Sequence, residues 1–267
     1  MKTILITGST DGIGKLTAIK LAKDGYQLIL HGRNEEKLKN TISEIKELTA
    51  NGNVSGFVSD LSDFNSIKKM IIDISNEFSS IDILINNAGV LKSPIQNNQD
   101  DLDMRFAVNY FAPYLLTNGL LPILKNSISP RIINLSSAAQ STVSMDALKG
   151  KVQISSNEAY AQSKLALTMW SFDFARENQN IVTIAVNPGS LLNTRMANEA
   201  YGQHWSPAEK GGDILYDLAL STNHNNNSGK YFDNDKGVFS EAHNDAYNQE
   251  RINELLTETT QILKNDT

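Results

Sequence analysis

Four polar side chains near the middle of the chain are of types that move a proton to or from a reacting oxygen. Tyr160 and Lys164 are four residues apart, so on a helix they share one face, one turn apart. A phenol has an ordinary pKa of about 10, and a nearby ammonium lowers that pKa by stabilising the phenolate. A lone pair with this spacing more often marks a helix surface, so its meaning depends on the residues that accompany it.

Ser137 and Asn109 accompany the pair. Ser136-Ser137 ends a β-branched run, and a serine hydroxyl at that point can donate a hydrogen bond to a substrate carbonyl. Asn109 falls in a helix expected before that run, where a side-chain amide can hold a water that relays protons to the lysine. Taken alone, each residue is better explained as structural. Together, the four residues favour general acid–base chemistry on a carbonyl or an alcohol.

A glycine-rich turn near the amino terminus has the composition of a phosphate cradle. It contains Thr7-Gly8-Ser9-Thr10-Asp11-Gly12-Ile13-Gly14, between the first expected strand and the first expected helix. Gly8 permits a tight turn, Gly12 leaves room for a pyrophosphate, and Gly14 permits close helix packing. Free N–H groups and the helix dipole favour an anion there. Glycines also serve ordinary turns, but this position predicts a dinucleotide site, whose contacts include Ser9, Thr10 and Ile13.

The end of the second expected strand distinguishes the two nicotinamide dinucleotides. Gly32 stands where an NAD site offers a carboxylate to the ribose, and Arg33 supplies a guanidinium suited to a 2′-phosphate. NADP is therefore preferred, with NAD as the alternative. In the competing interpretation Arg33 is a surface residue paired with Glu36, while Asn34 caps the next helix. Asp11 would repel a 2′-phosphate if its carboxylate pointed inward.

Two further motifs follow expected strands. Asp60-Leu61 offers a carboxylate to an adenine amino group and an apolar contact to its ring, although Asp60 or Ser62 could instead cap a helix. Asn86-Asn87-Ala88-Gly89 offers amides that tie strand ends together and small residues that leave room for a ribose. A plain turn explains this second motif equally well.

The last expected strand of the main series ends at Asn187-Pro188-Gly189, with Thr194 beyond it. We expect Thr194 to bind the nicotinamide carboxamide and Pro188 to restrict the ring face, with a helix-capping threonine as the alternative. The partly apolar segment 190–206 is expected to fold over substrate as a lid, and an ordinary surface loop is its alternative. Specificity is also expected from the segment 138–157 and from the loop after Gly89.

The elements that must position these residues alternate along the chain. Short β-branched runs predict strands at 2–7, 27–31, 53–59, 81–86, 130–136 and 181–187. Spaced apolar residues predict helices at 13–24, 34–49, 63–79, 100–125, 158–178 and 207–220, and a terminal helix at 244–263. A short last strand is expected at Gly229–Phe232, after a solvated polar loop at 223–228. The alternation predicts an α/β fold, one doubly wound parallel sheet with helices on both faces, in a single domain over 1–267.

Composition narrows the function classes. The chain has 24 Lys+Arg against 30 Asp+Glu, a net charge of −6, and no basic block, which disfavours nucleic acid and anionic membranes as partners. The absence of cysteine excludes disulfides and thiolate chemistry and permits a reducing, cytoplasmic setting. No apolar run approaches a membrane span or a signal peptide. The four histidines lack metal-ligand spacing, so no metal is expected.

In their order along the chain, these motifs resemble the short-chain dehydrogenase/reductase family over residues 3 to about 235. The resemblance implies a Rossmann fold that uses NAD(P)(H), with Tyr160 as proton donor or acceptor. It also implies that Lys164 holds the nicotinamide ribose and lowers the tyrosine pKa, that Ser137 orients substrate, and that Asn109 organises a water chain. The 23 positions from Ser137 to Tyr160 are similar to the spacing in the retinol-dehydrogenase-like branch, which does not itself establish a retinoid substrate.

The leading hypothesis is an NADP-preferring oxidoreductase that acts on a small-molecule carbonyl or alcohol. A cofactor-sensing binding protein without turnover is the alternative, and a non-redox lyase on the same scaffold is a third. The apolar residues of the helix 158–178 are expected to pack in the core, with a homodimer face as the alternative.

Overall fold

The computed structural model describes residues 1–264, apart from the side chain of Tyr201. One sheet runs through it in the order β3-β2-β1-β4-β5-β6-β7-β8. Its strands are β1 (Thr3–Ile6), β2 (Gln27–Gly32), β3 (Val54–Val58), β4 (Ile83–Asn86), β5 (Arg131–Leu135), β6 (Val182–Asn187), β7 (Lys230–Asp233) and β8 (Val238–Ser240). All neighbours pair in parallel except β7 and β8, which are antiparallel. The predicted doubly wound α/β fold is confirmed.

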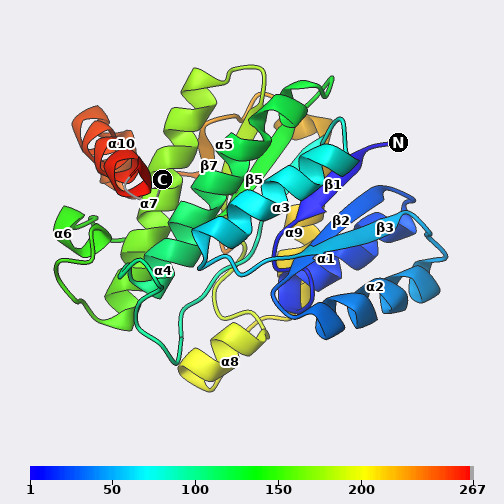
Figure 1. The fold of residues 1–267 in the computed structure, drawn as a ribbon, viewed down its shortest axis with the longest axis horizontal. Helices are drawn as coiled ribbons and strands as arrows, with labels where there is room; N and C mark the ends of the chain where they lie inside the picture. Colours follow the sequence, from blue (N-terminus) through cyan, green and yellow to red (C-terminus); the bar gives the residue numbers. More distant parts are fainter. Residues whose placement is uncertain (265–267) are drawn as a thin grey trace.

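Helices cover both faces of this sheet (Figure 1). They are α1 (Gly12–Lys23), α2 (Glu35–Thr49), α3 (Phe64–Glu77), α4 (Met104–Phe106), α5 (Ala112–Lys125), α6 (Met145–Leu148), α7 (Ser156–Glu177), α8 (Arg195–Tyr201), α9 (Ala208–Leu220) and α10 (Gln249–Lys264). Helices α3, α5 and α7 pack on one face, and α1, α2 and α9 pack on the other.

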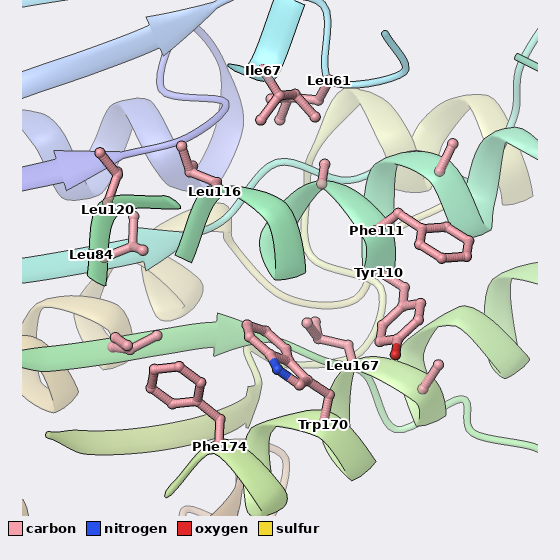
Figure 2. Close-up of a cluster of buried hydrophobic side chains, with 14 of the residues drawn as sticks. Leu61, Ile67, Leu84, Tyr110, Phe111, Leu116, Leu120, Leu167, Trp170 and Phe174 are labelled. Atoms are coloured by element: carbon pink, nitrogen blue, oxygen red, sulfur yellow. The ribbon is translucent and has the colours of Figure 1, made fainter. Parts of the chain in front are cut away.

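The strands form as near-continuous apolar runs because both of their faces are buried. Side chains alternate across the sheet, so Leu5 and Leu84 contact the cluster under α3, α5 and α7. Ile4 and Ile83, one position earlier in each strand, contact the cluster under α1, α2 and α9. Figure 2 shows the first cluster, in which Trp170 of α7 lies among aliphatic and aromatic side chains. These two clusters fix the positions at which the parallel strands end.

The helix predicted at 100–125 is interrupted, and this prediction was wrong in its continuity. Asp103 caps α4, a π-helical turn follows at Ala107–Phe111, and α5 begins at Ala112. Proline has no N–H, so Pro113 cannot donate to the carbonyl of Asn109, four residues earlier. The N–H of Ala112 instead reaches the carbonyl of Ala107, five residues back. The resulting turn places Asn109 against the loop after β4.

The polar loop expected at 223–228 is not simply solvated. A short 3₁₀ helix at Thr222–His224 leads into this loop. Asn225, the next residue, accepts a hydrogen bond from the guanidinium of Arg131 at 2.5 Å. Arg131 also donates to the carbonyls of Leu218 and Ser221, at 2.5 and 3.0 Å. The loop therefore satisfies a buried arginine at the start of β5, which its composition alone does not reveal.

The carboxyl-terminal segment packs against α7 (Figure 1). A 3₁₀ turn spans Asn244–Tyr247, and α10 then begins at Gln249. Thr259 of α10 is fully buried and forms a 2.7 Å hydrogen bond with the hydroxyl of Tyr110. Apolar residues of α10 thus complete the larger core cluster. Over residues 1–264, no helix combines the length and the apolar composition that a membrane span needs.

Candidate active site

A cleft of about 820 Å³ opens at the carboxyl ends of the parallel strands. Residues from the predicted site that line it are Gly8, Thr10, Gly12, Ile13, Arg33, Asp60, Leu61, Asn87, Ala88, Gly89, Tyr160, Lys164, Pro188 and Thr194. The predicted residues Ser9, Gly14, Asn109, Ser137 and Gly189 are not among its lining residues, whereas Ser136 is. Motifs that are up to 186 residues apart in sequence therefore meet at one edge of the sheet, as the topology requires.

The glycine turn leaves backbone exposed to this cleft. Gly8 has a φ of +63°, and a Cβ there would lie 2.8 Å from the Cα of Ala88. A Cβ on Gly14 would lie 2.4 Å from the amide nitrogen of Asn87, which donates to the carbonyls of Thr7 and Gly8. These close approaches fasten the turn to the end of β4. The start of α1 is left facing the cleft, an arrangement that suits a pyrophosphate.

A buried histidine, which was not predicted from the sequence, holds the same turn from the other side. The N–H of Gly8 donates to Nδ1 of His31 at 3.0 Å, and Nε2 lies 3.0 Å from the carbonyl of Ser59. Burial lowers the pKa of His31 to about 4, so near neutral pH its ring is neutral and donates from Nε2. Ser9 is also buried, and its Oγ accepts from the N–H of His31 at 2.9 Å. The Ser9 side chain thus shapes the turn and does not face the cleft.

The negative charge of Asp11 is compensated within the protein. One oxygen accepts from the N–H of Gly12 at 2.8 Å, and the other lies 2.7 Å from Nζ of Lys37. The Lys37 hydrogen bond lowers the pKa of Asp11. Asn34 caps α2, as the sequence suggested. Arg33 is exposed, and among the described side chains none forms an ion pair with it, so the pairing with Glu36 in the competing interpretation is not formed.

Asp60 and Leu61, which the sequence predicts to contact an adenine, line the cleft. Asp60 accepts from the N–H and the hydroxyl of Ser62, at 2.8 and 2.7 Å, while Leu61 is buried against the core. The cap of α3 is Asp63, which accepts from Asn65 and Ser66. The alternative that Asp60 or Ser62 caps this helix is therefore wrong, because the helix begins one residue later than expected.

Lys164 is the buried cation of the cleft, with only 4% of its surface exposed. Its Nζ donates to the carbonyl of Leu135 at 2.7 Å and lies 5.5 Å from the ring centroid of Tyr160. Burial lowers the pKa of Lys164 to about 7. A Cβ on Gly89 would lie 3.4 Å from this nitrogen, so glycine keeps the space above the lysine open. The pair predicted from sequence spacing therefore shares one face of α7 inside the cleft.

Asn109 joins three parts of the site. Its Oδ1 accepts from the N–H of Val90 at 2.8 Å, and its Nδ2 donates to the carbonyl of Val90 and to Oγ of Ser163, at 2.9 and 3.0 Å. Both amide hydrogens are used, so a water on this amide would have to donate to Oδ1, which has a second lone pair. The backbone carbonyl of Asn109, for which Pro113 has no N–H, is a second acceptor that such a water could use.

The two serines at the end of β5 have different surroundings. Ser136 is buried, and its Oγ lies 2.7 Å from Oγ1 of Thr168 and 3.2 Å from the carbonyl of Lys164, which fastens β5 to α7. Ser137 is half-buried, and its Oγ accepts from the N–H of Ala139 at 3.1 Å. That bond uses an oxygen lone pair and leaves the hydroxyl hydrogen to donate elsewhere. The Ser136 hydroxyl is thus occupied in joining β5 to α7, and the Ser137 hydroxyl is not.

The turn after β7, which was not predicted to belong to the site, forms hydrogen bonds with Asn187-Pro188-Gly189 at the end of β6. The Asn187 amide donates to Asp233 at 3.0 Å and to Asp235 at 2.9 Å. Asn234 donates to the carbonyl of Pro188 at 2.8 Å. The acidic and amide residues at 233–235 had no spacing that marked them as site residues. Their partners are about 46 positions away and become neighbours only through the pairing of β6 with β7.

The segment 190–206 contains α8, which the sequence did not predict. Thr194 caps α8 by accepting from the N–H of Ala197 at 3.3 Å, as the alternative interpretation held, and it also lines the cleft. Met196 lines the cleft as well, whereas Trp205 is 72% exposed. The predicted lid residue Tyr201 has its side chain outside the described residues. The segment therefore borders the cleft with part of its apolar surface and presents the rest to solvent.

Known proteins are similar to this chain both in sequence and in structure. Residues 2–204 match the family described as short chain dehydrogenase. Human polyprenol dehydrogenase is 37% identical over 203 residues, which are 72% of this chain and 61% of that protein. Mouse retinol dehydrogenase 13 is 34% identical over 98% of this chain and 84% of its own length. The chain thus spans about three fifths of the human relative. A solved short-chain dehydrogenase of Shigella flexneri, complexed with NADP, has a TM-score of 0.70 at 28% identity and covers 88% of this chain and 97% of its own.

Proposed function

This chain belongs to the short-chain dehydrogenase family, in its retinol-dehydrogenase-like branch, and on that premise we propose that it is an NADP-preferring oxidoreductase interconverting a carbonyl and an alcohol. The observation that carries the proposal is the buried Lys164 ammonium, 5.5 Å from the ring of Tyr160, in the cleft beside the glycine turn. A buried cation next to a phenol is an arrangement that supports proton exchange with a reacting oxygen.

The hydrogen-bond donors and the cationic side chain at the cofactor end of the cleft fit NADP. The start of α1 offers backbone N–H groups to a pyrophosphate, and a Cβ at Gly12 would meet nothing nearer than the Thr194 side chain at 3.7 Å. Arg33 offers a guanidinium for a 2′-phosphate, and Lys37 compensates Asp11 beside it. The Shigella relative carries NADP in its solved structure, which supports the same assignment here. When bound, the nicotinamide supplies the carbon that gives or takes the hydride.

The proton is assigned to Tyr160. In the reducing direction the phenol donates its proton to the carbonyl oxygen, and in the oxidising direction the phenolate takes the alcohol proton. Lys164 stabilises the phenolate by its charge, and Ser137 donates a hydrogen bond to the same substrate oxygen. Asn109 keeps the loop after β4 in contact with α7 through Val90 and Ser163. We assign it a positioning role, with its carbonyl as the site for a relay water.

The test is turnover of reduced nicotinamide with a panel of aldehydes, ketones and alcohols, for the unaltered chain and for Tyr160→Phe. We expect the substitution to lower kcat by about a thousandfold or more while the Kd for NADPH stays within about twofold. Tyr216→Phe is the matched control, since it removes a tyrosine hydroxyl that donates to Asp24, away from the cleft. Undiminished turnover by Tyr160→Phe would refute the assignment. Tight NADPH binding with no turnover across the panel would favour a cofactor sensor.

We further assign the segment 190–206 as a lid over bound ligands, supported by Thr194 and Met196 on the cleft wall. Of the two tryptophans, Trp170 is buried and Trp205 is exposed. In a Trp170→Phe background, emission from Trp205 should shift to the blue when NADPH and substrate saturate the protein. An unchanged spectrum at saturation would contradict closure.

A further inference from the structure

Tyr231, in the middle of β7, contacts the site from outside the segment that matches the family. The match ends at residue 204, whereas Tyr231 lies beyond it with 4% of its surface exposed. Its hydroxyl donates to the backbone carbonyl of Ser137 at 3.0 Å. A buried tyrosine hydroxyl ordinarily finds one partner, and here the partner is the backbone of the residue proposed to orient substrate.

A second donor reaches the same carbonyl. The Gln140 amide donates to the carbonyl of Ser137 at 2.9 Å, and its oxygen accepts from the N–H of His243 at 3.1 Å. The Ser137 carbonyl is therefore bound on both lone pairs, from β7 and from the loop after β5. Through His243, the same amide also fastens that loop to the segment that leads to α10.

The hydroxyl of Tyr231 is held in its donor state. Burial, followed by the charges of Asp233 and Asp235 and by the neighbouring Tyr160, raises the pKa of Tyr231. Tyr231 thus donates to Ser137 throughout the pH range in which the enzyme would work, and does not compete with Tyr160 for the role of acid or base.

We propose that Tyr231 is a positioning residue for the reaction: by holding the Ser137 carbonyl, it fixes the direction of the Ser137 hydroxyl. This rests on the proposed function of Ser137. Tyr231 and Gln140 hold the Ser137 carbonyl, and with the backbone held in this way Oγ accepts from the N–H of Ala139 at 3.1 Å. The hydroxyl hydrogen is left to donate to a substrate oxygen. Fixing the direction of this hydroxyl raises kcat more than it improves binding.

The experiment is a double-mutant cycle on kcat with Tyr231→Phe, Ser137→Ala and the two together, using the best substrate of the panel. We expect Tyr231→Phe alone to lower kcat by about tenfold, with the Kd for NADPH within about twofold. In the Ser137→Ala background the same change should alter kcat by less than about twofold, because the group it positions is already gone. Tyr216→Phe serves as the control for loss of a tyrosine hydroxyl elsewhere.

Three results overturn the proposal. Losses that multiply in the double variant mean that Tyr231 acts on stability or on another group, and full activity of Tyr231→Phe means that the bond has no kinetic consequence. If Ser137→Ala alone keeps full turnover, Ser137 itself is misassigned, and the proposal fails with it while the Tyr160 assignment stands. Should Tyr231→Phe fail to fold, as judged by its Tm and NADPH binding, Gln140→Met removes the other donor and must show the same coupling to Ser137.

Discussion

Replacing the buried lysine with methionine tests the electrostatics of the cleft without any substrate. Lys164→Met keeps much of the side-chain volume and removes the ammonium, together with its bond to the Leu135 carbonyl. The lysine pKa falls from 10.5 to about 7 because burial penalises the charged form. A folded-state pKa below the unfolded value means that the unfolded chain binds more protons between these limits. The free energy of unfolding of the unaltered protein therefore rises with pH through this window, relative to Lys164→Met.

The magnitude follows from proton linkage. Each pH unit between about 7 and about 10.5 changes the free energy of unfolding by about 1.4 kcal/mol. Between about pH 7.5 and about pH 9.5, the unaltered protein should gain roughly 2 to 3 kcal/mol of stability relative to Lys164→Met. The lost packing and the unpaired Leu135 carbonyl add an offset that does not depend on pH. The slope of this stability difference against pH, and not the constant offset, measures how far burial lowers the pKa of Lys164.

Urea unfolding of the cofactor-free protein at several pH values measures this slope. Groups that titrate equally in both proteins cancel in the difference between them. Lys46→Met, which removes an exposed lysine of α2, controls for the loss of one positive charge. A difference between the unaltered protein and Lys164→Met that stays level from about pH 7.5 to about pH 9.5 would show that Lys164 is not held at a depressed pKa. Lys164 would then carry its positive charge beside Tyr160 throughout this pH range.

Further predictions concern the cofactor end and the turn after β7. Arg33→Ala should weaken NADPH binding by about tenfold and leave NADH binding within about twofold, as measured by fluorescence titration; equal losses for both would refute a 2′-phosphate contact. Lys37→Met should also weaken NADPH binding several-fold, and adding Asp11→Asn should recover most of that loss, because the uncompensated carboxylate has gone. Asp235→Ala should lower the free energy of unfolding by about 1–3 kcal/mol in urea, since it leaves the N–H of Ser190 and one of the two N–H groups of the Asn187 amide without an acceptor; an unchanged midpoint would contradict this.

The sequence predicts the strands and helices that position the site well, because the patterns that mark these elements are local in the chain. Strand ends are marked by β-branched runs that stop at small or polar residues, and Tyr160 and Lys164 share a helix face by spacing alone. The break before α5 is different. It depends on Pro113 lacking an N–H for the Asn109 carbonyl, and the apolar periodicity of the surrounding residues runs through it without a gap.

Residues that act through distant partners were missed for a related reason. His31 reads as one more position in a buried strand, yet its ring joins Gly8 to Ser59, 23 and 28 residues away. Asp235 lies in an acidic, glycine-containing turn that composition assigns to solvent, and it contacts Ser190 at 2.8 Å only once β7 pairs with β6. These contacts form only when distant strands and loops come together in the fold, so no spacing of residues in the sequence predicts them.

The short antiparallel β8 protects the last parallel strand. Without it, the outer N–H and C=O groups of Tyr231 to Asp233 would be open to pairing with another chain, the usual route by which uncovered strand edges seed aggregation. A chain cut after residue 237 would carry every proposed catalytic group and still expose that edge. We expect such a truncation to self-associate, and the strand that reaches Ser137 would be the one recruited.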